Sequence, residues 1–401
     1  MKKHDIVIVG GGPAGMMAGL LFARAGLDVA VLEKHGDFLR DFRGDTVHPS
    51  TLDLFDELGL LDALLAEPHD KVTEIGAVIG GRSYRVADFS HLPGRGRFVA
   101  MMPQWHFLDF VAHQARLYPS FGLRMETEAV ALVEDGGRIA GVRTRDGEEI
   151  VARLVILADG RTSILREAAG LPLLDLGVPI DVFWFRVPKE RAAANETAGY
   201  LSQGQMVVLI DRGDYFQCAR VIRKGSASEV QARGIAAFRE DMARAAPAIA
   251  PGIAAVHGWD DVKLLSVSLD RLTRWHRPGL LAIGDTAHAM SPVGGVGINL
   301  AIQDAVAAAN ILAAPMAEGR DPDPLLAKVQ ARRMLPVRIV QAIQRTVHRA
   351  VLEKALAGEI DRAPLALRVL DRAALLRRVP ARVLGLGVRR EHIRSPAASS
   401  P

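Results

Sequence analysis

The 401-residue sequence has little cysteine, few aromatic residues and no long apolar run. Cys218 is the single cysteine, so internal disulfides, CxxC redox pairs and thiolate zinc sites are excluded. We expect Cys218 to be a small buried hydrophobe; the alternative is a reactive thiol. No uninterrupted apolar run approaches the roughly 18 residues of a membrane span. The sequence therefore predicts a soluble, cytoplasmic protein.

The net charge of +4 conceals an asymmetry along the chain. From Arg320 to Pro401 there are 17 Lys and Arg against 7 Asp and Glu, whereas the rest of the chain has 33 against 39. The basic region lacks interleaved aromatic residues, which argues against nucleic-acid binding. A solvated helical face is the expected role, and a peripheral contact of the basic C-terminal helices with a membrane surface is the alternative. A monomer and a homodimer are both left open.

The chain begins with a predicted strand, a glycine-rich turn and a helix. Residues 6–9 are an apolar run typical of a strand buried on both faces, and a helix-like run follows at residues 16–25. Between them, Gly10, Gly12 and Gly15 form the pattern GxGxxG. Gly10 suits a tight turn, Gly12 lets the backbone approach a pyrophosphate, and Gly15 lets helix and strand pack closely. The N–H groups of the helix N-terminus can then bind phosphates.

A second apolar run, residues 29–32, ends at Glu33, which lies 18 residues after Gly15. An acid at this place can accept hydrogen bonds from an adenosine ribose. Strand, glycines, helix, strand and acid in this order predict a dinucleotide site.

Two later apolar strands also end in glycine loops. One ends at Asp159-Gly160 and the other at Gly284-Asp285. In a doubly wound sheet, loops at the carboxyl ends of the strands meet at the ligand crevice. We therefore expect one dinucleotide to be contacted from three directions. For Asp159 alone, capping of the next helix is an equal alternative to contact with a cofactor or with an incoming nicotinamide nucleotide.

The run from Gly284 to Asn299 is rich in features that suit a flat ligand. Asp285 can accept hydrogen bonds from hydroxyl groups, and Pro292 stiffens the loop. Glycines at 294, 295 and 297 let the backbone lie against a ring. The helix that follows offers N–H groups to developing negative charge, as on a reduced flavin.

These three motifs resemble those of the single-component flavoprotein aromatic hydroxylases, the family of para-hydroxybenzoate hydroxylase and the ubiquinone-pathway hydroxylases. The resemblance covers essentially the whole chain. It implies FAD as cofactor, NAD(P)H as reductant and O2 as co-substrate. It further implies transfer of one oxygen atom from a flavin C4a-hydroperoxide to a phenol-like or other electron-rich small molecule. The alternatives are an FAD-dependent reductase or dehydrogenase of the prenyl-chain reductase type, and a non-catalytic FAD-binding protein.

The resemblance also implies the cofactor contacts. It places the pyrophosphate at the first glycine motif and the adenosine ribose at Glu33, with Lys34 beside it. The implied contacts are Gly10, Gly12, Pro13, Ala14, Gly15, Glu33, Lys34, Arg43, Gln104, Asp159, Gly160, Gly284, Asp285, Pro292, Gly295, Val296, Gly297, Ile298 and Asn299.

The substrate pocket is less marked in the sequence. Tyr215 and Gln217 alternate on one strand and can line a cavity beside Pro292, or they are ordinary sheet residues. His48 is either a proton shuttle or a histidine at the start of a helix. No residue is named as general base, and no histidine has companion acids at metal-ligand spacing, so no metal site is predicted.

The predicted fold class is α/β, with a Rossmann-like FAD-binding domain, an inserted, mostly antiparallel sheet and a helical C-terminus. The FAD-binding domain comprises residues 1–178 and 275–320. The substrate sheet comprises residues 179–274, with contributions from about 72–101. C-terminal helices follow at 321–394, and residues 395–401 are predicted to be a disordered tail.

Two helices carry more detailed predictions. Leu335, Ile339, Ile343, Val347 and Val351 form an i, i+4 row that we expect to pack on the body of the protein. The segment from Ser226 to Glu229 resembles a capping box that opens a helix ending near Ala245.

Overall fold

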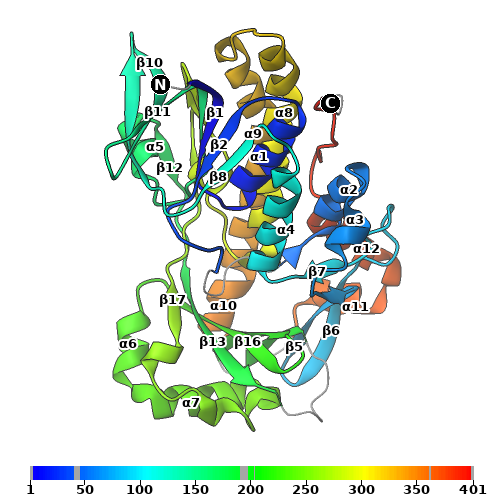
Figure 1. Cartoon of the computed structure of the whole chain (residues 1–401). Coiled ribbons are helices and arrows are strands. Elements are labelled where there is room, and N and C mark those ends of the chain that lie inside the picture. Colours follow the sequence, from blue (N-terminus) through cyan, green and yellow to red (C-terminus); the bar gives the residue numbers. More distant parts are fainter. Residues whose placement is uncertain (1–2, 40–45, 190–196, 203, 361–362, 399–401) are drawn as a thin grey trace.

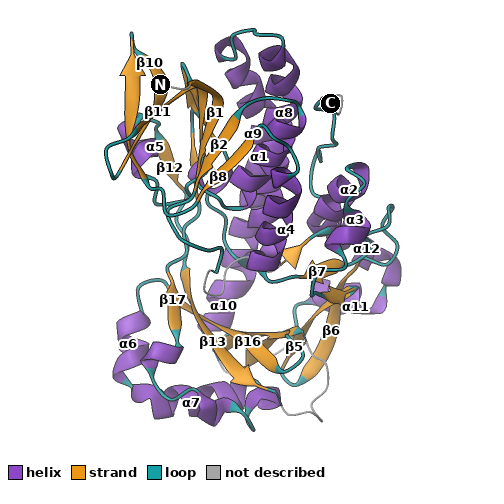
Figure 2. Ribbon diagram, viewed as in Figure 1, coloured by secondary structure: helices purple, strands orange, loops and turns teal. Residues whose placement is uncertain are grey.

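The chain folds into two large sheets with helices packed on them, and two small sheets lie beside these (Figures 1 and 2). The computed structural model describes residues 3–39, 46–189, 197–202, 204–360 and 363–398. The larger sheet lies in the upper half of Figure 1 beside several long helices, and the smaller sheet lies in the lower half. This architecture and the helical C-terminus confirm the predicted fold class.

The larger sheet carries the N-terminal motif on a central strand. Its order is β19-β20-β11-β1-β2-β8, and the neighbours from β20 to β8 pair in parallel. β1 is fully buried from Ile6 onward, which explains why its sequence is continuously apolar rather than alternating. The strands are β1 (Lys3–Val9), β2 (Val29–Leu32), β8 (Phe121–Arg124), the antiparallel hairpin β9 (Ala129–Asp135) and β10 (Arg138–Thr144), β11 (Glu149–Leu157), β19 (His276–Arg277) and β20 (Leu280–Ala282).

Helices α1 (Pro13–Arg24), α4 (Gln104–Arg116) and α8 (Gly297–Ala317) lie on the same side of this sheet, and α1 packs against both others (Figure 1). The segment Val293–Ala317 is long and apolar enough to cross a membrane by length and composition alone. However, 78% of its most apolar window is buried inside the protein. Its place in the core therefore accounts for its apolar sequence.

The smaller sheet has the order β17-β13-β16-β15-β14-β5-β6. Its pairs are antiparallel except for β14 with β5. Helices α6 (Ala227–Ala232) and α7 (Gly234–Ala245) lie below the sheet in Figure 1. The strands are β5 (Glu74–Ile79), β6 (Arg82–Asp88), β13 (Ile180–Pro188), β14 (Ala198–Ser202), β15 (Gln205–Asp211), β16 (Tyr215–Arg223) and β17 (Lys263–Leu265). The segment 74–88 thus joins a sheet made mainly by residues 180–265, while the domain boundaries stay a prediction.

The two faces of the smaller sheet have different partners. Phe216 and Cys218 belong to a core cluster with Phe238 and Met242 of α7. Cys218 is fully buried, as predicted, and its burial raises the pKa of the thiol. The alternate residues Ala219 and Val221 belong to a separate cluster that includes Leu352, with Val293 packed against it. This second face therefore looks toward the loop of the third glycine motif.

Short elements connect the two halves of the molecule. The remaining strands form two small sheets, β3-β7-β4 and β12-β18. Their bounds are β3 (Thr46–Val47), β4 (Asp70–Val72), β7 (Val99–Met101), β12 (Leu173–Asp175) and β18 (Asp270–Leu272). The remaining α-helices are α2 (Pro49–Glu57), α3 (Leu61–Leu64), α5 (Ile164–Ala168), α9 (Asp323–Val347), α10 (Glu353–Leu356), α11 (Leu365–Arg372) and α12 (Ala374–Gly385), with a π-helical turn at His348–Leu352 between α9 and α10.

The prediction for the apolar row from Leu335 to Val351 is wrong for Leu335 and Ile343 of α9, whereas Val351 beyond the helix packs against a buried cluster as predicted. Leu335 and Ile343 are 49% and 40% exposed. The buried side of α9 instead includes the polar side chains of Arg333, Gln341 and Gln344. Each of these has partners on other elements, so burial leaves it hydrogen-bonded.

The predicted disorder of residues 395–401 is wrong for the described part of the tail. The guanidinium of Arg24 donates to Ser395 O at 3.0 Å, and the Ala398 N–H donates to Arg24 O at 2.8 Å. Asn310 Oδ1 accepts from the Ser395 N–H at 2.8 Å. These bonds hold residues 395–398 against α1 and α8.

Candidate functional site

The three glycine loops meet at the carboxyl ends of β1, β11 and β20. Gly10 has φ +105°, and a Cβ added there would lie 2.4 Å from Ala158 O, on the loop after β11. Gly284 has φ +60°, and an added Cβ would lie 2.9 Å from the Cβ of Ala14 in α1. Both contacts require glycine, because of the positive φ and because of the close approach. The structure thus brings the first motif against the second and the third.

The first turn of α1 is open to an anion. Gly12 is the N-cap and Pro13 the first helical residue, with no capping side chain and no acid in the first turn. A Cβ added at Gly12 would have no atom within 4 Å, whereas one at Gly15 would lie 1.9 Å from Gly10 O. Gly15 is therefore needed for packing, while Gly12 leaves space above the free N–H groups. This space fits the pyrophosphate of a dinucleotide.

Glu33 braces the glycine loop. It is 6% exposed, and its carboxylate accepts from the Gly11 N–H at 2.9 Å and from the His35 N–H at 3.0 Å. It lies at the end of β2, beside the first motif, where the sequence pattern predicts an adenosine ribose. Lys34 follows it and is exposed. The bonds to Gly11 and His35 are a structural role that the sequence pattern did not indicate.

The second and third motifs are joined by hydrogen bonds. Thr286 Oγ1 donates to Asp159 at 3.1 Å and accepts from the Gly160 N–H at 2.8 Å. Arg161 Nη2 donates to Asp285 at 2.8 Å. Burial raises the pKa of Asp159 above its usual range, although hydrogen bonds from its neighbours oppose the shift. Thr286 and Arg161 were not predicted as site residues. The only indication of their role in the sequence is that they lie next to the two motifs.

The loop before α8 is fixed by one side chain. Asn299 Oδ1 accepts from the His48 N–H at 2.9 Å and from Thr51 Oγ1 at 2.8 Å. Its Nδ2 donates to Thr46 O at 3.1 Å and to Gly295 O at 3.2 Å. The bonds to His48, Thr51 and Thr46 join the start of α8 to the segment around β3 and α2, and the bond to Gly295 lies within the loop. The Asn299 side chain is therefore occupied within the protein, and only its backbone remains for a ligand.

The other predicted contacts of this loop surround the same junction. Pro292 precedes a single 3-10 turn at Val293–Gly295, and Val296 is the N-cap of α8. Gly297 and Ile298 are the first residues of α8, and no acid lies in its first turn. The N-terminus of α8 thus has no carboxylate that would compete for its N–H groups.

His48 occupies the start of a helix. It is the N-cap residue of α2 and is 1% exposed. Its Nδ1 lies 2.7 Å from Leu384 O, and burial lowers the pKa of its imidazole despite this bond. The structure therefore agrees with the structural alternative for His48. Gln104 is the first residue of α4, and Arg43 lies outside the described residues.

A buried network of charges lies directly behind the third motif. Asp304 of α8 is fully buried and accepts from the Gly284 N–H at 3.1 Å, from Arg333 Nε at 2.9 Å and from His288 Nε2 at 2.6 Å. Arg333 Nη1 also lies 3.3 Å from Glu391. Burial alone would raise the pKa of Asp304, but His288 and Arg333 outweigh it and lower the pKa. The network ties the Gly284 turn to α8, α9 and the C-terminal segment.

Comparison with known proteins identifies the family. A family model described as "FAD binding domain" matches residues 3–343. The chain is 32% identical over 386 residues to 6-methylpretetramide 4-monooxygenase of Streptomyces rimosus, covering 94% of this chain and 91% of the relative. The chain belongs to the family of FAD-dependent aromatic hydroxylases. It is an oxidoreductase that uses FAD.

Two further comparisons show a similar sequence and a similar fold. Dialkyldecalin synthase of Streptomyces rugosporus is 26% identical over 319 residues, which is 76% of this chain and 64% of the relative. The crystal structure of PqsL from P. aeruginosa in complex with 2-aminobenzoylacetate has a TM-score of 0.77 and 24% identity, and covers 90% of this chain and all of that one. The latter likeness supports the fold alone.

In this hydroxylase-family chain, the smaller sheet presents a mixed polar and apolar face toward the third motif. Gln217 is 4% exposed and lies on the same face as Ala219. Arg212 Nε donates to Gln217 Oε1 at 3.3 Å, and the guanidinium of Arg186 lies 5.1 Å from the Tyr215 ring centroid. Gln217 and Tyr215 thus have partners within the sheet.

Trp184 lies on the same face of β13 and was not predicted as a site residue. It pairs with Ala219 across the strands and packs against the cluster that includes Leu352. Its Nε1 is buried and has no hydrogen-bond partner in the described part of the chain. An unpaired buried N–H is costly, so this donor is a candidate to bind a ligand.

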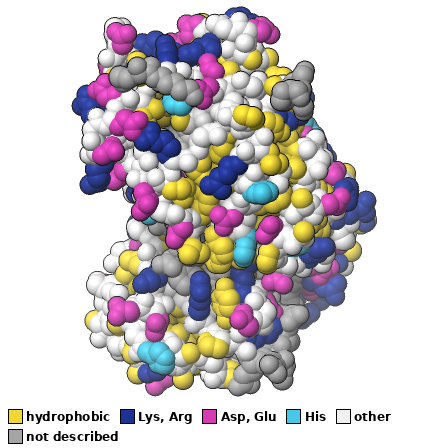
Figure 3. All heavy atoms as spheres, viewed as in Figure 1, with side chains coloured by type: hydrophobic (Ala, Val, Ile, Leu, Met, Phe, Trp, Pro, Cys, Tyr) yellow, Lys and Arg dark blue, Asp and Glu magenta, His cyan; other side chains and the backbone are white. Residues whose placement is uncertain are grey.

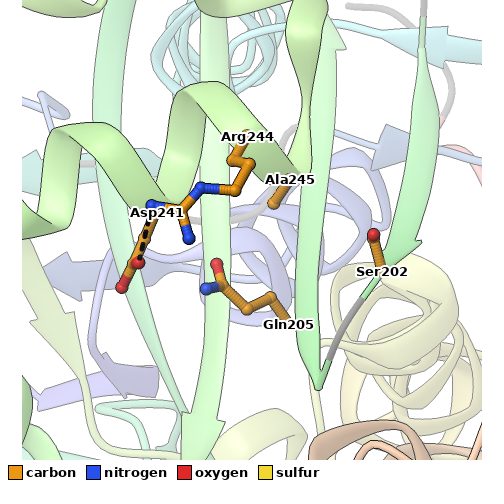
Figure 4. Close-up of a pocket in the computed structure, with 5 residues that line it drawn as sticks. All are labelled: Ser202, Gln205, Asp241, Arg244 and Ala245. Carbon is orange, nitrogen blue, oxygen red and sulfur yellow. Dashed lines mark ion pairs between the residues drawn. The ribbon is translucent and has the colours of Figure 1, made fainter.

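Figure 4 shows a small cavity on the smaller sheet. It has a volume of about 10 Å³ and lies between β14, β15 and α7. Its lining includes Gln205 and the ion pair of Asp241 with Arg244 at 3.9 Å. The cavity has room for about one water molecule. It also lies on the α7 side of the sheet, away from the glycine loops.

Proposed function

We propose that this protein is an NAD(P)H-dependent FAD monooxygenase that inserts one oxygen atom from O2 into an aromatic or similarly electron-rich small molecule. The observation that carries the proposal is the junction of the three glycine loops. The open N-terminus of α1, the acid after β2 and the Asp285 loop lie at one edge of one sheet. Such an arrangement can hold an extended dinucleotide along its whole length.

FAD would be held by residues from all three motifs. We assign the pyrophosphate to the first turn of α1 from Gly12 to Gly15, the adenosine ribose to Glu33 and the ribityl chain to Asp285. The ring would lie against the backbone from Pro292 to Ile298. Bound FAD supplies the redox chemistry, namely acceptance of a hydride and activation of O2.

The protein's own residues would position charge and exclude water. The N–H groups at the start of α8, which have no side-chain cap, would stabilise the negative charge of a reduced ring bound at this loop. The apolar face of the smaller sheet, with Val182, Ala219 and Val221, packs toward Val293 of the same loop. An apolar cover of this kind limits the access of water to a reactive intermediate.

We place the substrate between the ring and this face of the sheet. Trp184 Nε1 would donate a hydrogen bond to a substrate oxygen. Gln217 and Tyr215 would lie at the margin of the substrate pocket. One relative supports an aromatic substrate, since it is named as a 4-monooxygenase of 6-methylpretetramide.

Anaerobic and aerobic turnover distinguish the proposal from its alternatives. Purified protein is mixed with NADH or NADPH and a panel of aromatic compounds, and flavin bleaching, O2 uptake and product are recorded. A monooxygenase consumes O2 with product, and one of the panel compounds accelerates flavin reduction. Product formation in the absence of O2 would instead support a reductase or a synthase. Bound FAD that no nicotinamide nucleotide reduces would support a non-catalytic protein.

A further inference from the structure

Helices α11 and α12 present apolar side chains to solvent. Both pack on β6, and their free side carries five large hydrophobic side chains that are 44–72% exposed. These are Leu365, Val369, Leu375, Leu376 and Val379. The other exposed large hydrophobic side chains of the described chain are spread over several elements, with at most two on any one of them. Single exposed apolar residues are ordinary on protein surfaces, but a contiguous group points to an interaction site.

The spacing makes these helices amphipathic. In α11, Leu365 and Val369 are one turn apart, and the exposed Arg368 and Arg372 repeat the same spacing beside them. Leu367 points the other way, into a buried cluster. The free face of α11 is therefore apolar and flanked by arginine.

Helix α12 repeats this arrangement. Leu375, Val379 and Arg382 lie on one exposed side at i, i+4 and i+7. The opposite side, with Ala381 and Gly385, is buried. A Cβ added at Gly385 would lie 2.8 Å from a Leu92 side-chain atom, so this side packs closely on the body. The apolar face of α12 thus stays exposed, although the opposite side of the helix is packed on the protein.

The surface is also strongly cationic. Residues 363–390 contain seven arginines and one acid, Asp371, whose carboxylate accepts from the Arg85 N–H at 3.0 Å. Arg82 and Arg85 of the neighbouring β6 are exposed as well. Figure 3 shows Lys and Arg side chains gathered at the edge where Figure 1 places α11 and α12. Helices α11 and α12 therefore combine exposed apolar side chains with positive charge.

We propose that α11 and α12 dock the protein on the surface of an anionic phospholipid bilayer. Amphipathic helices with an apolar face and flanking arginines lie in the membrane interface, where acyl chains cover the apolar groups and phosphates meet the guanidiniums. A second copy fits less well, because a two-fold interface would bring two arginine-rich faces together. Nucleic acid also fits less well, since residues 363–390 include no aromatic side chain for stacking.

The test uses the full-length, FAD-loaded protein and liposome flotation. Vesicles of phosphatidylcholine alone are compared with vesicles containing phosphatidylglycerol, at low and at high salt. Binding is expected only to the anionic vesicles and to fall at high salt. The double variant Leu375→Ser/Val379→Ser should lower the partition coefficient by about tenfold or more. The control Leu117→Ser/Leu264→Ser changes side chains that are 66% and 49% exposed elsewhere and should bind like the parent.

A charge variant separates docking from misfolding. Arg378 and Arg382 are exposed, so Arg378→Gln/Arg382→Gln should fold and retain FAD, while binding falls by about 30-fold. The proposal is overturned if the parent does not bind anionic vesicles, or if the control loses as much binding as the apolar variant. It is also overturned if sedimentation velocity shows a dimer that Leu375→Ser/Val379→Ser dissociates, since a second copy then covers this face. None of these outcomes bears on the proposed oxygen chemistry.

Discussion

Replacement of Asp304 by asparagine should destabilise the protein by about 3–5 kcal/mol. The carboxylate is fully buried and accepts from Arg333, His288 and the Gly284 N–H. The variant keeps the shape but removes the charge, which leaves the buried Arg333 guanidinium with Glu391 as its remaining carboxylate partner in this network. Removal of one charge of a buried ion pair lowers stability by more than the intact pair contributes, because the other charge stays buried without this partner.

The expected change in melting temperature follows from the chain length. An unfolding entropy of roughly 2.1 cal/mol/K per residue gives about 0.8 kcal/mol/K for the whole chain. The loss of 3–5 kcal/mol therefore lowers Tm by about 4–6 °C, measured by calorimetry on FAD-free protein. The matched control is Glu318→Gln, because Glu318 and Arg320 also form a short ion pair, of 2.6 Å, but are both about 60% exposed. That change should shift stability by less than about 0.5 kcal/mol.

The pH dependence gives this prediction a second readout. His288 and Arg333 hold the pKa of Asp304 below its usual range despite burial. A depressed carboxyl pKa stabilises the folded state above the unfolded pKa of about 3.9, and this contribution is lost as pH falls through the folded pKa. The gap in stability between parent and Asp304→Asn should thus shrink as pH falls below about 4. A variant as stable as the parent at neutral pH would refute the assigned role of the network.

Three further predictions concern the cofactor and substrate sites. Gly12→Ala should leave the stability of the FAD-free protein within about 0.5 kcal/mol of the parent and should weaken FAD binding. Gly15→Ala should instead fail to fold, because its Cβ would collide with a backbone oxygen, whereas the Cβ at position 12 would meet no atom. Equal behaviour of the two variants in refolding and flavin titration would contradict this prediction. Asp285→Ala should lose FAD and remain folded, since its pair with Arg161 is partly exposed; normal flavin content after purification would show that the third motif is misassigned. Trp184→Phe should raise KM several-fold with unchanged FAD content and a smaller effect on kcat; an unchanged KM would remove Trp184 from the substrate site.

The features that the sequence predicts well are short, continuous segments of the chain. The strand at residues 29–32 has the predicted bounds, and the three glycine loops lie at strand ends as expected. In each case the signal is carried by adjacent residues, since an apolar strand, a turn glycine and a helix start follow one another directly. The meeting of the loops then follows from the parallel topology of the sheet.

Long-range polar partners explain most of what the sequence could not predict. The buried side of α9 includes Arg333, whose partner Asp304 is 29 residues away, and Gln344, which binds Ser291 from 53 residues away. Periodicity of apolar residues cannot identify such a side, because it treats these residues as solvent-facing. The tail is a similar case, since Ser395 binds Arg24 across 371 residues.

One further prediction is wrong because a side chain binds a different backbone group nearby. Ser226 was expected to cap a helix, but its Oγ donates to Arg223 O, and its side chain makes no capping bond. The helix also breaks into α6 and α7 at Gly234, which has φ +84°. Serine side chains bind nearby backbone groups in several ways, so the sequence pattern alone does not select one of them.

The most direct test of the proposed chemistry is turnover under 18O2 with NADH or NADPH and a substrate found in the screen. The proposal predicts one 18O atom in each product molecule, with the second atom recovered in water. Label from H2 18O instead of 18O2, or product that forms at an undiminished rate without oxygen, would contradict it.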